Sequence, residues 1–348
     1  MFSRQAASAV PPGFRSDLLR WRQLVDADWL ATLLRQAADP QAKHAPLAAA
    51  PARWLLLEVG CEGDGAYLGG HIPGARFLDT REMEQAPFWN SLPDAALLHL
   101  LQQRLGLGLH STVILYARNT LAAARVAHLL LYAGVQDVRL LDGGLAAWCA
   151  AGHALEQGCA HGLGSAQERE PAVGCAAAQE GAWLAWRAGV PAQADYLLNL
   201  HQTRALLQQP ITTLVSIRSR AEFMGETSGY SYIAARGEIP GALWGHAGRD
   251  GDVNSMNSFQ QADGRMKSAT EIAAVWAAAG IGPEQHVVFY CGTGWRASLA
   301  FFYAWLMGWP RISVFDGGWM EWSADTANPV VCRSAPGVPE PGTALANA

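Results

Sequence analysis

The sequence has few charged residues and no excess of positive charge. Charged side chains make up 16% of the 348 residues, and the formal net charge is −5. A chain with this balance offers no general electrostatic attraction to nucleic acid or to an anionic membrane. Half of the residues are apolar, which is typical of a globular protein with a large buried core. We therefore expect no nucleic-acid partner and no membrane partner.

Cysteine pairs with metal-binding spacing are also lacking. The six cysteines, at positions 61, 149, 159, 175, 291 and 332, form no C-x-x-C motif and no His/Cys cluster with zinc spacing. We expect no metal site and no cofactor. A chain of this size does not need disulfides for stability, so reduced thiols and a cytoplasmic location are expected. Residues 1–12 contain no apolar core of signal-peptide length, and the longest apolar run, after the cysteine, is too short to span a membrane.

What the sequence does contain is a cysteine at a sharp change of pattern. Cys291 follows the strand-like run 286–290 and precedes the glycine-rich turn 292–296, after which residues 297–307 predict a buried helix. Backbone amides of such a turn, the positive end of the helix and Arg296 would all favour a thiolate. The alternative is a small buried apolar cysteine. The two glycines and Arg296 favour the reactive thiol.

The region around Cys291 has an earlier counterpart in the chain. Tyr116 and Asp142 in the first copy correspond to Tyr290 and Asp316 in the second, and each pair is 26 positions apart. In both copies an aspartate begins an Asp-Gly-Gly-x-x-x-Trp motif. Upstream, the turn Gly-His-Ile-Pro-Gly-Ala at 70–75 is echoed by Gly-Glu-Ile-Pro-Gly-Ala at 237–242. The alternation of strands and helices predicts an α/β protein with an open parallel sheet flanked by helices in each copy.

The two copies differ at the cysteine. Ala117 stands where the second copy has Cys291, so we expect no thiol chemistry in the first copy. It could form a wall of the cleft over the second copy's loop, or it could recognise a partner. The predicted boundaries are a first domain at 24–155, a linker at 156–193, a second domain at 194–324 and a flexible tail at 325–348.

These motifs together resemble the tandem-domain rhodanese family, the sulfurtransferases that pair an inactive first domain with a catalytic second domain. The resemblance covers roughly residues 24–324 and depends on the Cys-Gly-Thr-Gly-Trp-Arg loop, the two Ile-Pro-Gly-Ala turns and the two Asp-Gly-Gly motifs. It implies that Cys291 takes a sulfur from a donor as a persulfide and passes it to cyanide or a thiol. A protein could also be the sulfur acceptor.

The resemblance also implies a set of site residues around the catalytic Cys291. We expect the sulfur donor to be bound by residues of the loop and by one strand-end arginine, namely Gly292, Thr293, Gly294, Trp295, Arg296, Ala297 and Arg218. Thr293 could donate a hydrogen bond to the sulfur or the loop, and Ser298 is expected to cap the helix.

Several of these assignments have structural alternatives. Arg296 could pair with Glu222 or Asp316 instead of a donor, and Trp295 could be a lid or ordinary core packing. Arg218 is more often structural in the family, and Ser216 replaces the aspartate that usually accompanies it.

The identity of the sulfur donor is open at this stage. Glu222 lies where related enzymes place a donor-binding arginine, and the insertion 225–232, absent from the first copy, is expected to shape the mouth of the site. The loop beginning resembles mercaptopyruvate sulfurtransferases, whereas Arg296 resembles thiosulfate and persulfide-transfer enzymes. We expect thiosulfate or a similar anionic donor. The alternatives are 3-mercaptopyruvate, or a persulfide carrier with little free turnover. A phosphatase is disfavoured because only four residues separate Cys291 from Arg296.

Overall fold

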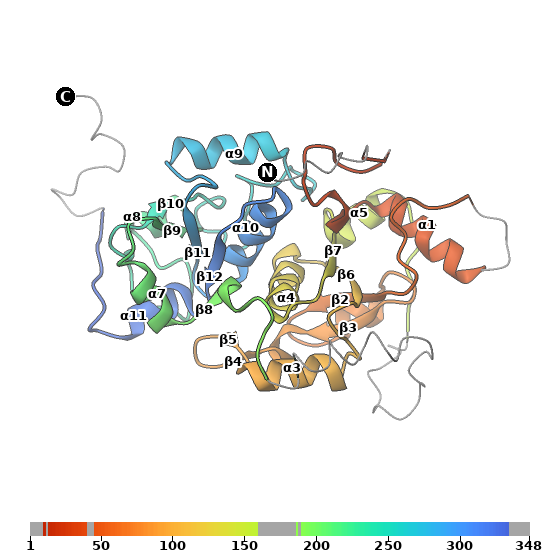
Figure 1. Cartoon of the computed structure of the whole chain (residues 1–348), viewed down its shortest axis with the longest axis horizontal. Coiled ribbons are helices and arrows are strands. Elements are labelled where there is room, and N and C mark those ends of the chain that lie inside the picture. Colours follow the sequence, from red (N-terminus) through yellow and green to blue (C-terminus); the bar gives the residue numbers. More distant parts are fainter. Residues whose placement is uncertain (1–9, 12, 40–44, 159–185, 187–188, 334–348) are drawn as a thin grey trace, which may run out of the picture.

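The computed structural model describes residues 10–11, 13–39, 45–158, 186 and 189–333. Two α/β domains lie side by side along the long axis of the molecule (Figure 1). Each contains a five-stranded parallel sheet, with the order β1-β7-β6-β2-β3 in the first domain and β8-β12-β11-β9-β10 in the second. The predicted fold class is therefore confirmed, and both copies of the repeat have the same strand order.

The first domain begins with a short 3-10 helix, Trp21–Gln23. Its strands are β1 (Leu24–Val25), β2 (Leu55–Gly60), β3 (Arg76–Asp79), β6 (Thr112–Ala117) and β7 (Asp137–Leu141), with the small hairpin β4 (Glu84–Gln85) and β5 (Asn90–Ser91). Its helices are α1 (Ala27–Ala38), α2 (Gly65–Gly69), α3 (Asp94–Gln103), α4 (Thr120–Ala133) and α5 (Gly144–Ala150), with a 3-10 turn at Thr80–Glu82.

The second domain follows a 3-10 turn at Ala194–Tyr196. Its strands are β8 (Leu197–Leu198), β9 (Thr212–Ser216), β10 (Leu243–Trp244), β11 (His286–Tyr290) and β12 (Ile312–Phe315). Its helices are α7 (Leu200–Leu206), α8 (Arg220–Met224), α9 (Ala269–Ala278), α10 (Trp295–Leu306) and α11 (Gly318–Ala324).

Alternating side chains of the central strands separate two layers of core in each domain. In β11, Val287 and Phe289 face the layer that contains α9 and α10, whereas Val288 and Tyr290 face the layer that contains α11. This period of two is the pattern of a strand buried on both faces. Cys291 continues the alternation on the side of α10, which is the side turned toward the first domain.

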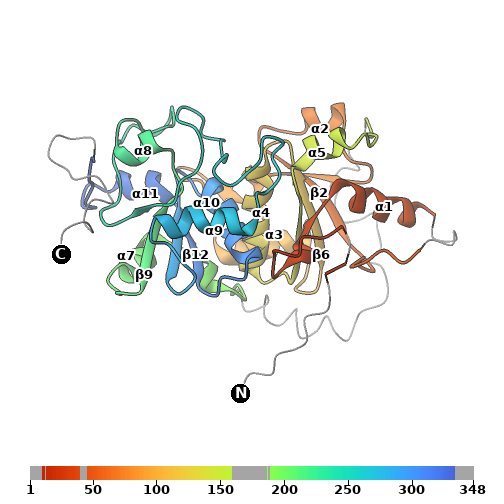
Figure 2. The same ribbon diagram turned by 90° about the horizontal axis from the view of Figure 1, so that it is seen from above.

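Helices α4 and α10 pack against each other at the centre of the molecule (Figures 1 and 2). Both are apolar around most of their surface because each is covered by its own sheet and by the other helix. One hydrophobic core therefore runs from the sheet of the first domain through both helices to the sheet of the second. The helix predicted after Cys291 is confirmed as a buried helix, with every residue from Arg296 to Leu306 buried.

Some boundaries differ from those expected. Residues 325–333, which we assigned to a flexible tail, pack on the second domain, where Val331 pairs with Glu238 and Asn328 accepts a hydrogen bond from Arg204. In the expected linker, Trp186 is buried and donates to the carbonyl of Ala133. Residues 159–185 of the linker and 334–348 of the tail lie outside the described residues. Within the described part of the chain, no helix is long and apolar enough to cross a membrane.

Candidate sulfur-transfer site

Cys291 lies at the carboxyl end of β11, where ligands bind in open parallel sheets. Its backbone carbonyl accepts a hydrogen bond of 2.7 Å from the amide of Trp319, and the carbonyl of Gly292 accepts one of 3.0 Å from Met320. Both donors belong to the first turns of α11, which follows the Asp-Gly-Gly motif. The segment of the Asp-Gly-Gly motif therefore fixes the backbone at the start of the cysteine loop.

The cysteine loop, residues 291–296, turns directly into α10. Gly294 is the N-cap of α10 and has a φ of +96°, a left-handed conformation that favours glycine. Its amide donates a hydrogen bond of 3.2 Å to the Cys291 Sγ. The sulfur thus lies next to the positive end of a buried helix, an arrangement that stabilises a thiolate or a persulfide anion.

Both terminal nitrogens of the Arg296 guanidinium have partners within the protein. Its two terminal nitrogens donate to the two carboxylate oxygens of Glu222 at 2.8 Å each, and one of them also donates to the Tyr230 hydroxyl at 2.7 Å. Burial opposes the ionisation of Glu222, but Arg296, together with Arg218 and the Ser219 amide, outweighs burial and lowers the pKa of Glu222. The charge of Arg296 is therefore balanced within the protein, which is the structural alternative that the sequence left open.

Two tyrosines of the insertion 225–232 cover the cysteine loop. The Tyr230 ring lies so close to Gly292 that a Cβ at position 292 would be 2.3 Å from two ring carbons. Tyr232 is half exposed, contacts the Tyr230 ring at a centroid distance of 5.4 Å and shares a hydrogen bond with the Thr293 side chain. Cys291 is 1% exposed beneath this cover. The two tyrosines therefore belong to the cover of the buried cysteine loop.

Arg218 is enclosed by other groups of the second domain. Its guanidinium is fully buried, donates to the Gly237 carbonyl at 2.7 Å and lies 3.5 Å from Glu238 and 3.6 Å from Glu222. Glu238 supplies the carboxylate that the sequence lacks at Ser216, whose hydroxyl it binds at 2.7 Å. The short contact of Arg218 is thus with the Gly237 carbonyl, and both neighbouring carboxylates balance its charge. Its part in binding the donor stays a prediction from the sequence.

The remaining expected residues occupy the start of α10. Ala297 is buried in the first turn. Trp295 packs against the shared core, and its indole N–H donates to the Glu84 carboxylate of the first domain at 3.1 Å. The expectation that Ser298 caps the helix is wrong. Gly294 is the N-cap without a side-chain cap, and the Ser298 hydroxyl lies 3.3 Å from His128 on α4.

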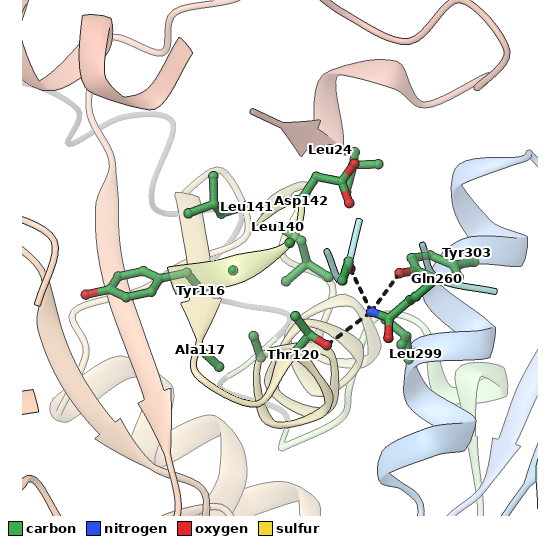
Figure 3. A pocket seen from close by; sticks show the side chains of 14 residues that line it. Leu24, Tyr116, Ala117, Thr120, Leu140, Leu141, Asp142, Gln260, Leu299 and Tyr303 are labelled. Carbon is green, nitrogen blue, oxygen red and sulfur yellow. Dashed lines mark hydrogen bonds between the residues drawn. The ribbon is translucent and has the colours of Figure 1, made fainter. Parts of the chain in front are cut away.

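The corresponding position of the first domain is filled by protein (Figure 3). Ala117 and Thr120 line a very small cavity, together with Gln260 and Tyr303 of the second domain. The Gln260 amide donates to the Thr120 hydroxyl at 3.1 Å and to the Tyr303 hydroxyl at 3.3 Å. This position has neither a thiol nor the space that a donor would need.

Four residues near the cysteine loop were not identified as site residues from the sequence. Tyr230 and Tyr232 lay in the insertion that we expected to shape the mouth, but their individual contacts could not be read from it. Arg125 is a lone charge in the apolar run of α4, which is a usable signal for a buried ion pair. Glu84 lies in a short hairpin with no pattern that marks it.

The described residues contain no cluster of His, Cys, Asp and Glu that could hold a metal ion. The four cysteines within those residues are free thiols, and of these Cys291 is buried whereas Cys61, Cys149 and Cys332 are exposed.

Comparison with known proteins agrees with the architecture of the site. The rhodanese-like domain family matches residues 49–151 and 199–325. The chain is 46% identical over 319 residues to thiosulfate sulfurtransferase YnjE of Escherichia coli K12, covering 92% of this chain and 67% of YnjE. It is 33% identical over 285 residues to a probable 3-mercaptopyruvate sulfurtransferase of Pseudomonas aeruginosa PAO1, covering 79% and 89% of the two chains.

Solved structures show the same relationship. The crystal structure of YnjE superposes with a TM-score of 0.77 at 45% identity, covering 90% of this chain and 69% of that one. A structure of EanB with a cysteine persulfide and ergothioneine superposes with a TM-score of 0.73 at 33% identity, covering 90% and 71%. From its two matching regions, its duplicated sheets and its cysteine loop, the chain belongs to the rhodanese family and is a sulfurtransferase with two rhodanese-like domains.

Proposed function

We propose that the protein transfers a sulfane sulfur from thiosulfate, or a similar anionic donor, to cyanide or a thiol acceptor through a persulfide on Cys291. The observation that carries this proposal is the hydrogen bond of 3.2 Å from the Gly294 amide to the Cys291 Sγ at the N-terminus of α10. The relationship to a thiosulfate sulfurtransferase supports the donor, and the persulfide described for EanB supports the intermediate.

The first half of the reaction loads the cysteine. The Cys291 thiolate attacks the outer sulfur of thiosulfate, a new S–S bond forms, and sulfite leaves with the electron pair of the old S–S bond. The product is a persulfide anion on Cys291. Amides at the start of α10 stabilise its charge, since residues in the first turn of a helix have no intrahelical acceptor for their N–H groups. Gly292 and Gly294 allow these amides to converge on one sulfur atom.

The second half of the reaction removes the outer sulfur from the Cys291 persulfide. The acceptor attacks the outer sulfur, and Cys291 leaves as a thiolate, ready for another cycle. Cyanide yields thiocyanate, and a thiolate yields a persulfide. A protein thiol is chemically equivalent to a small one, so a protein acceptor uses the same step. The cytoplasmic location remains a prediction from the sequence.

The paired Arg296 bears on the choice of donor. Because Glu222 balances its charge at 2.8 Å, Arg296 acts mainly to fix Tyr230 and the loop. Thiosulfate then depends on the loop amides and the helix terminus for its binding. The similarity to a probable 3-mercaptopyruvate sulfurtransferase keeps 3-mercaptopyruvate as the second candidate donor.

Steady-state kinetics with thiosulfate and 3-mercaptopyruvate, each with cyanide as acceptor, test the proposal. We expect kcat/KM to be higher with thiosulfate and transfer to fall below detection in Cys291→Ser, with the far-UV circular dichroism unchanged. Cys61→Ser and Cys149→Ser serve as matched controls and should keep most of the activity. Activity near that of the wild type in Cys291→Ser would refute the mechanism. A stable persulfide after thiosulfate, with negligible turnover, would instead identify a carrier.

A further inference from the structure

Arg125 carries a buried positive charge from the first domain to the cysteine loop of the second. It lies on α4, is fully buried, and donates to Glu84 at 2.8 Å and to Asp316 at 2.6 Å. Asp316 is the aspartate of the second Asp-Gly-Gly motif and also accepts a hydrogen bond of 2.8 Å from the Ser91 amide. A buried ion pair is costly unless its geometry is good, so this cluster needs an explanation beyond stability.

Glu84 connects the same cluster to the loop by a second route. Its carboxylate accepts from the Trp295 indole N–H at 3.1 and 3.2 Å, in addition to the bond from Arg125. Burial raises the pKa of Glu84 to about 7, and Arg125 opposes the shift. The first domain thus binds two residues near Gly294. Glu84 binds Trp295, and Arg125 binds Asp316.

One terminal nitrogen of Arg125 lies against the loop itself. Its Nη1 has no hydrogen-bond partner within the described residues and would be 3.2 Å from a Cβ built on Gly294. Gly294 is the residue whose amide donates to the Cys291 Sγ. Arg125 therefore packs against the one loop residue that directly contacts the sulfur through a backbone hydrogen bond.

The first copy of the repeat provides an internal comparison. The alignment of the two copies places Leu299 of α10 where Arg125 lies in α4, and Leu299 lines the small cavity beside Ala117. Gln260 contacts Thr120 of that loop, as Glu84 contacts Trp295 of the cysteine loop. The loop without a cysteine thus faces a leucine and a glutamine, whereas the loop with the cysteine faces an arginine and a glutamate.

The aspartates of the two Asp-Gly-Gly motifs complete this comparison. Asp142 accepts from the Met266 amide at 2.8 Å, as Asp316 accepts from Ser91. The interface is therefore built in a similar way on both sides, and the side beside Ala117 has Leu299 and Gln260 where the other side has the ion pair of Arg125 and Glu84. Packing alone does not require the charges of Arg125 and Glu84.

From this asymmetry we infer that Arg125 and Glu84 of the first domain are positioning residues for the cysteine loop of the second domain. They fix Trp295, Asp316 and Gly294, and through the Gly294 amide they fix the Cys291 sulfur. The inference rests on the proposed role of Cys291 as the sulfur carrier. It gives the first domain a part in the reaction although it has no cysteine at its own loop.

The double variant Glu84→Gln with Arg125→Leu tests this inference, because it copies the pair found beside Ala117. Above about pH 7, where Glu84 is ionised, it also leaves the net charge of the cluster unchanged, since one negative and one positive charge are removed together. We expect kcat for sulfur transfer to fall by about tenfold or more, since small displacements of reacting groups have effects of this size. The rate of Cys291 alkylation by iodoacetamide, followed by peptide mass spectrometry from pH 5 to 9, should change as well.

Arg139→Leu is the matched control. Arg139 is also a buried arginine of the first domain, but its guanidinium binds Asp137 and the Ala49 carbonyl. This variant should lower the melting temperature without changing the alkylation profile of Cys291. If the double variant keeps both kcat and the alkylation profile within about twofold of the wild type, Arg125 and Glu84 have only a structural role and the inference is wrong.

A second variant covers the case in which the double variant does not fold. Glu84→Gln alone can keep hydrogen bonds to Trp295 and Arg125 while it removes one negative charge. We expect the alkylation profile of Cys291 to shift to lower pH, and an unshifted profile would count against the inference. Alkylation does not depend on sulfur transfer. If the wild type transfers no sulfur but the profile still responds to these variants, the proposed function fails and the positioning role stands.

Discussion

Gly292 has no side chain because the Tyr230 ring occupies the space beside it. A Cβ at position 292 would lie 2.3 Å from the ring and 2.5 Å from its hydroxyl, and the ring is itself held by Arg296. We predict that Gly292→Ala displaces Tyr230 and lowers the free energy of unfolding by about 1–3 kcal/mol, the usual cost of overpacking. Urea denaturation of the purified variant measures this change.

A double-mutant cycle shows whether Tyr230 is the cause. In the background Tyr230→Ala the added methyl group meets no ring, so Gly292→Ala should then cost much less than it does alone. Gly69→Ala is the control, since a Cβ there has no neighbour within 4 Å. Equal costs of Gly292→Ala in the two backgrounds would show that the contact with Tyr230 does not determine the choice of glycine.

At the level of single residues, the sequence predicted the local geometry of the cysteine loop better than the pairing of its side chains. Cys291, Gly294 and the start of α10 lie as expected because strand, turn and helix are consecutive and the geometry is local. The partner of Arg296 is 74 positions away, so the sequence could offer Glu222 only as one of two alternatives. Tyr230 could not be placed because an insertion without periodicity carries no information about which residue it buries.

The α4–α10 contact contains a histidine that must remain neutral. His128 is buried, its Nε2–H donates to the Tyr196 carbonyl at 2.9 Å, and its Nδ1 lies 3.3 Å from the Ser298 hydroxyl. Both ring nitrogens are thus satisfied in the uncharged form. Burial, reinforced by the nearby Arg125 cation, lowers the pKa of His128 to about 3.

This shift predicts a loss of stability in acid. The unfolded chain binds a proton on His128 near pH 6.5, whereas the folded chain does not until about pH 3, so the free energy of unfolding falls as the pH is lowered through this range. The contribution amounts to about 2 kcal/mol between pH 6.5 and 4.5. We predict that His128→Gln removes this part of the pH dependence, as measured by urea denaturation at several pH values.

The comparison of variant with wild type isolates His128. Glu84, whose raised pKa acts in the opposite direction, is present in both proteins and cancels in the difference. His99→Gln is the control because His99 lies exposed on α3. If wild type and His128→Gln lose stability in parallel on acidification, His128 accepts a proton in the folded protein.

Long helices and strands with a clear apolar pattern were predicted correctly, whereas short elements were not. The long buried strands β6 and β11 and the helices α4 and α10 are apparent from continuous apolar runs. The edge strands β1 and β8 have two residues each, too few to show an alternation, and only the sheet defines them. Residues 325–333 were assigned to a tail because prolines and small residues recur after Pro329, yet backbone bonds between Val331 and Glu238 and side-chain bonds from Arg204 fix them.

The whole molecule is a duplication in which each copy donates a backbone hydrogen bond to the Asp-Gly-Gly aspartate of the other. The hairpin of the first domain places Ser91 on Asp316, and the loop before α9 places Met266 on Asp142. The sequence left open whether the first copy is a wall or a recognition surface. In the structure the first copy packs against the cysteine loop of the second, with Glu84 on Trp295 and Arg125 beside Gly294, and recognition of a partner stays a prediction. Such contacts between copies could not be predicted, because a repeat aligns the copies without giving their relative orientation.

A core shared by both domains predicts that they unfold together. Side chains of α4 and α10 belong to one hydrophobic cluster, so neither domain can expose its half without disrupting the other. We predict one transition in differential scanning calorimetry. Leu33→Ala and Leu214→Ala lie in the separate outer cores of the two domains, and each removes about 2–5 kcal/mol of stability. Both should move the same transition to lower temperature. Two resolved peaks, with each variant shifting a different one, would mean that the α4–α10 contact does not couple the domains.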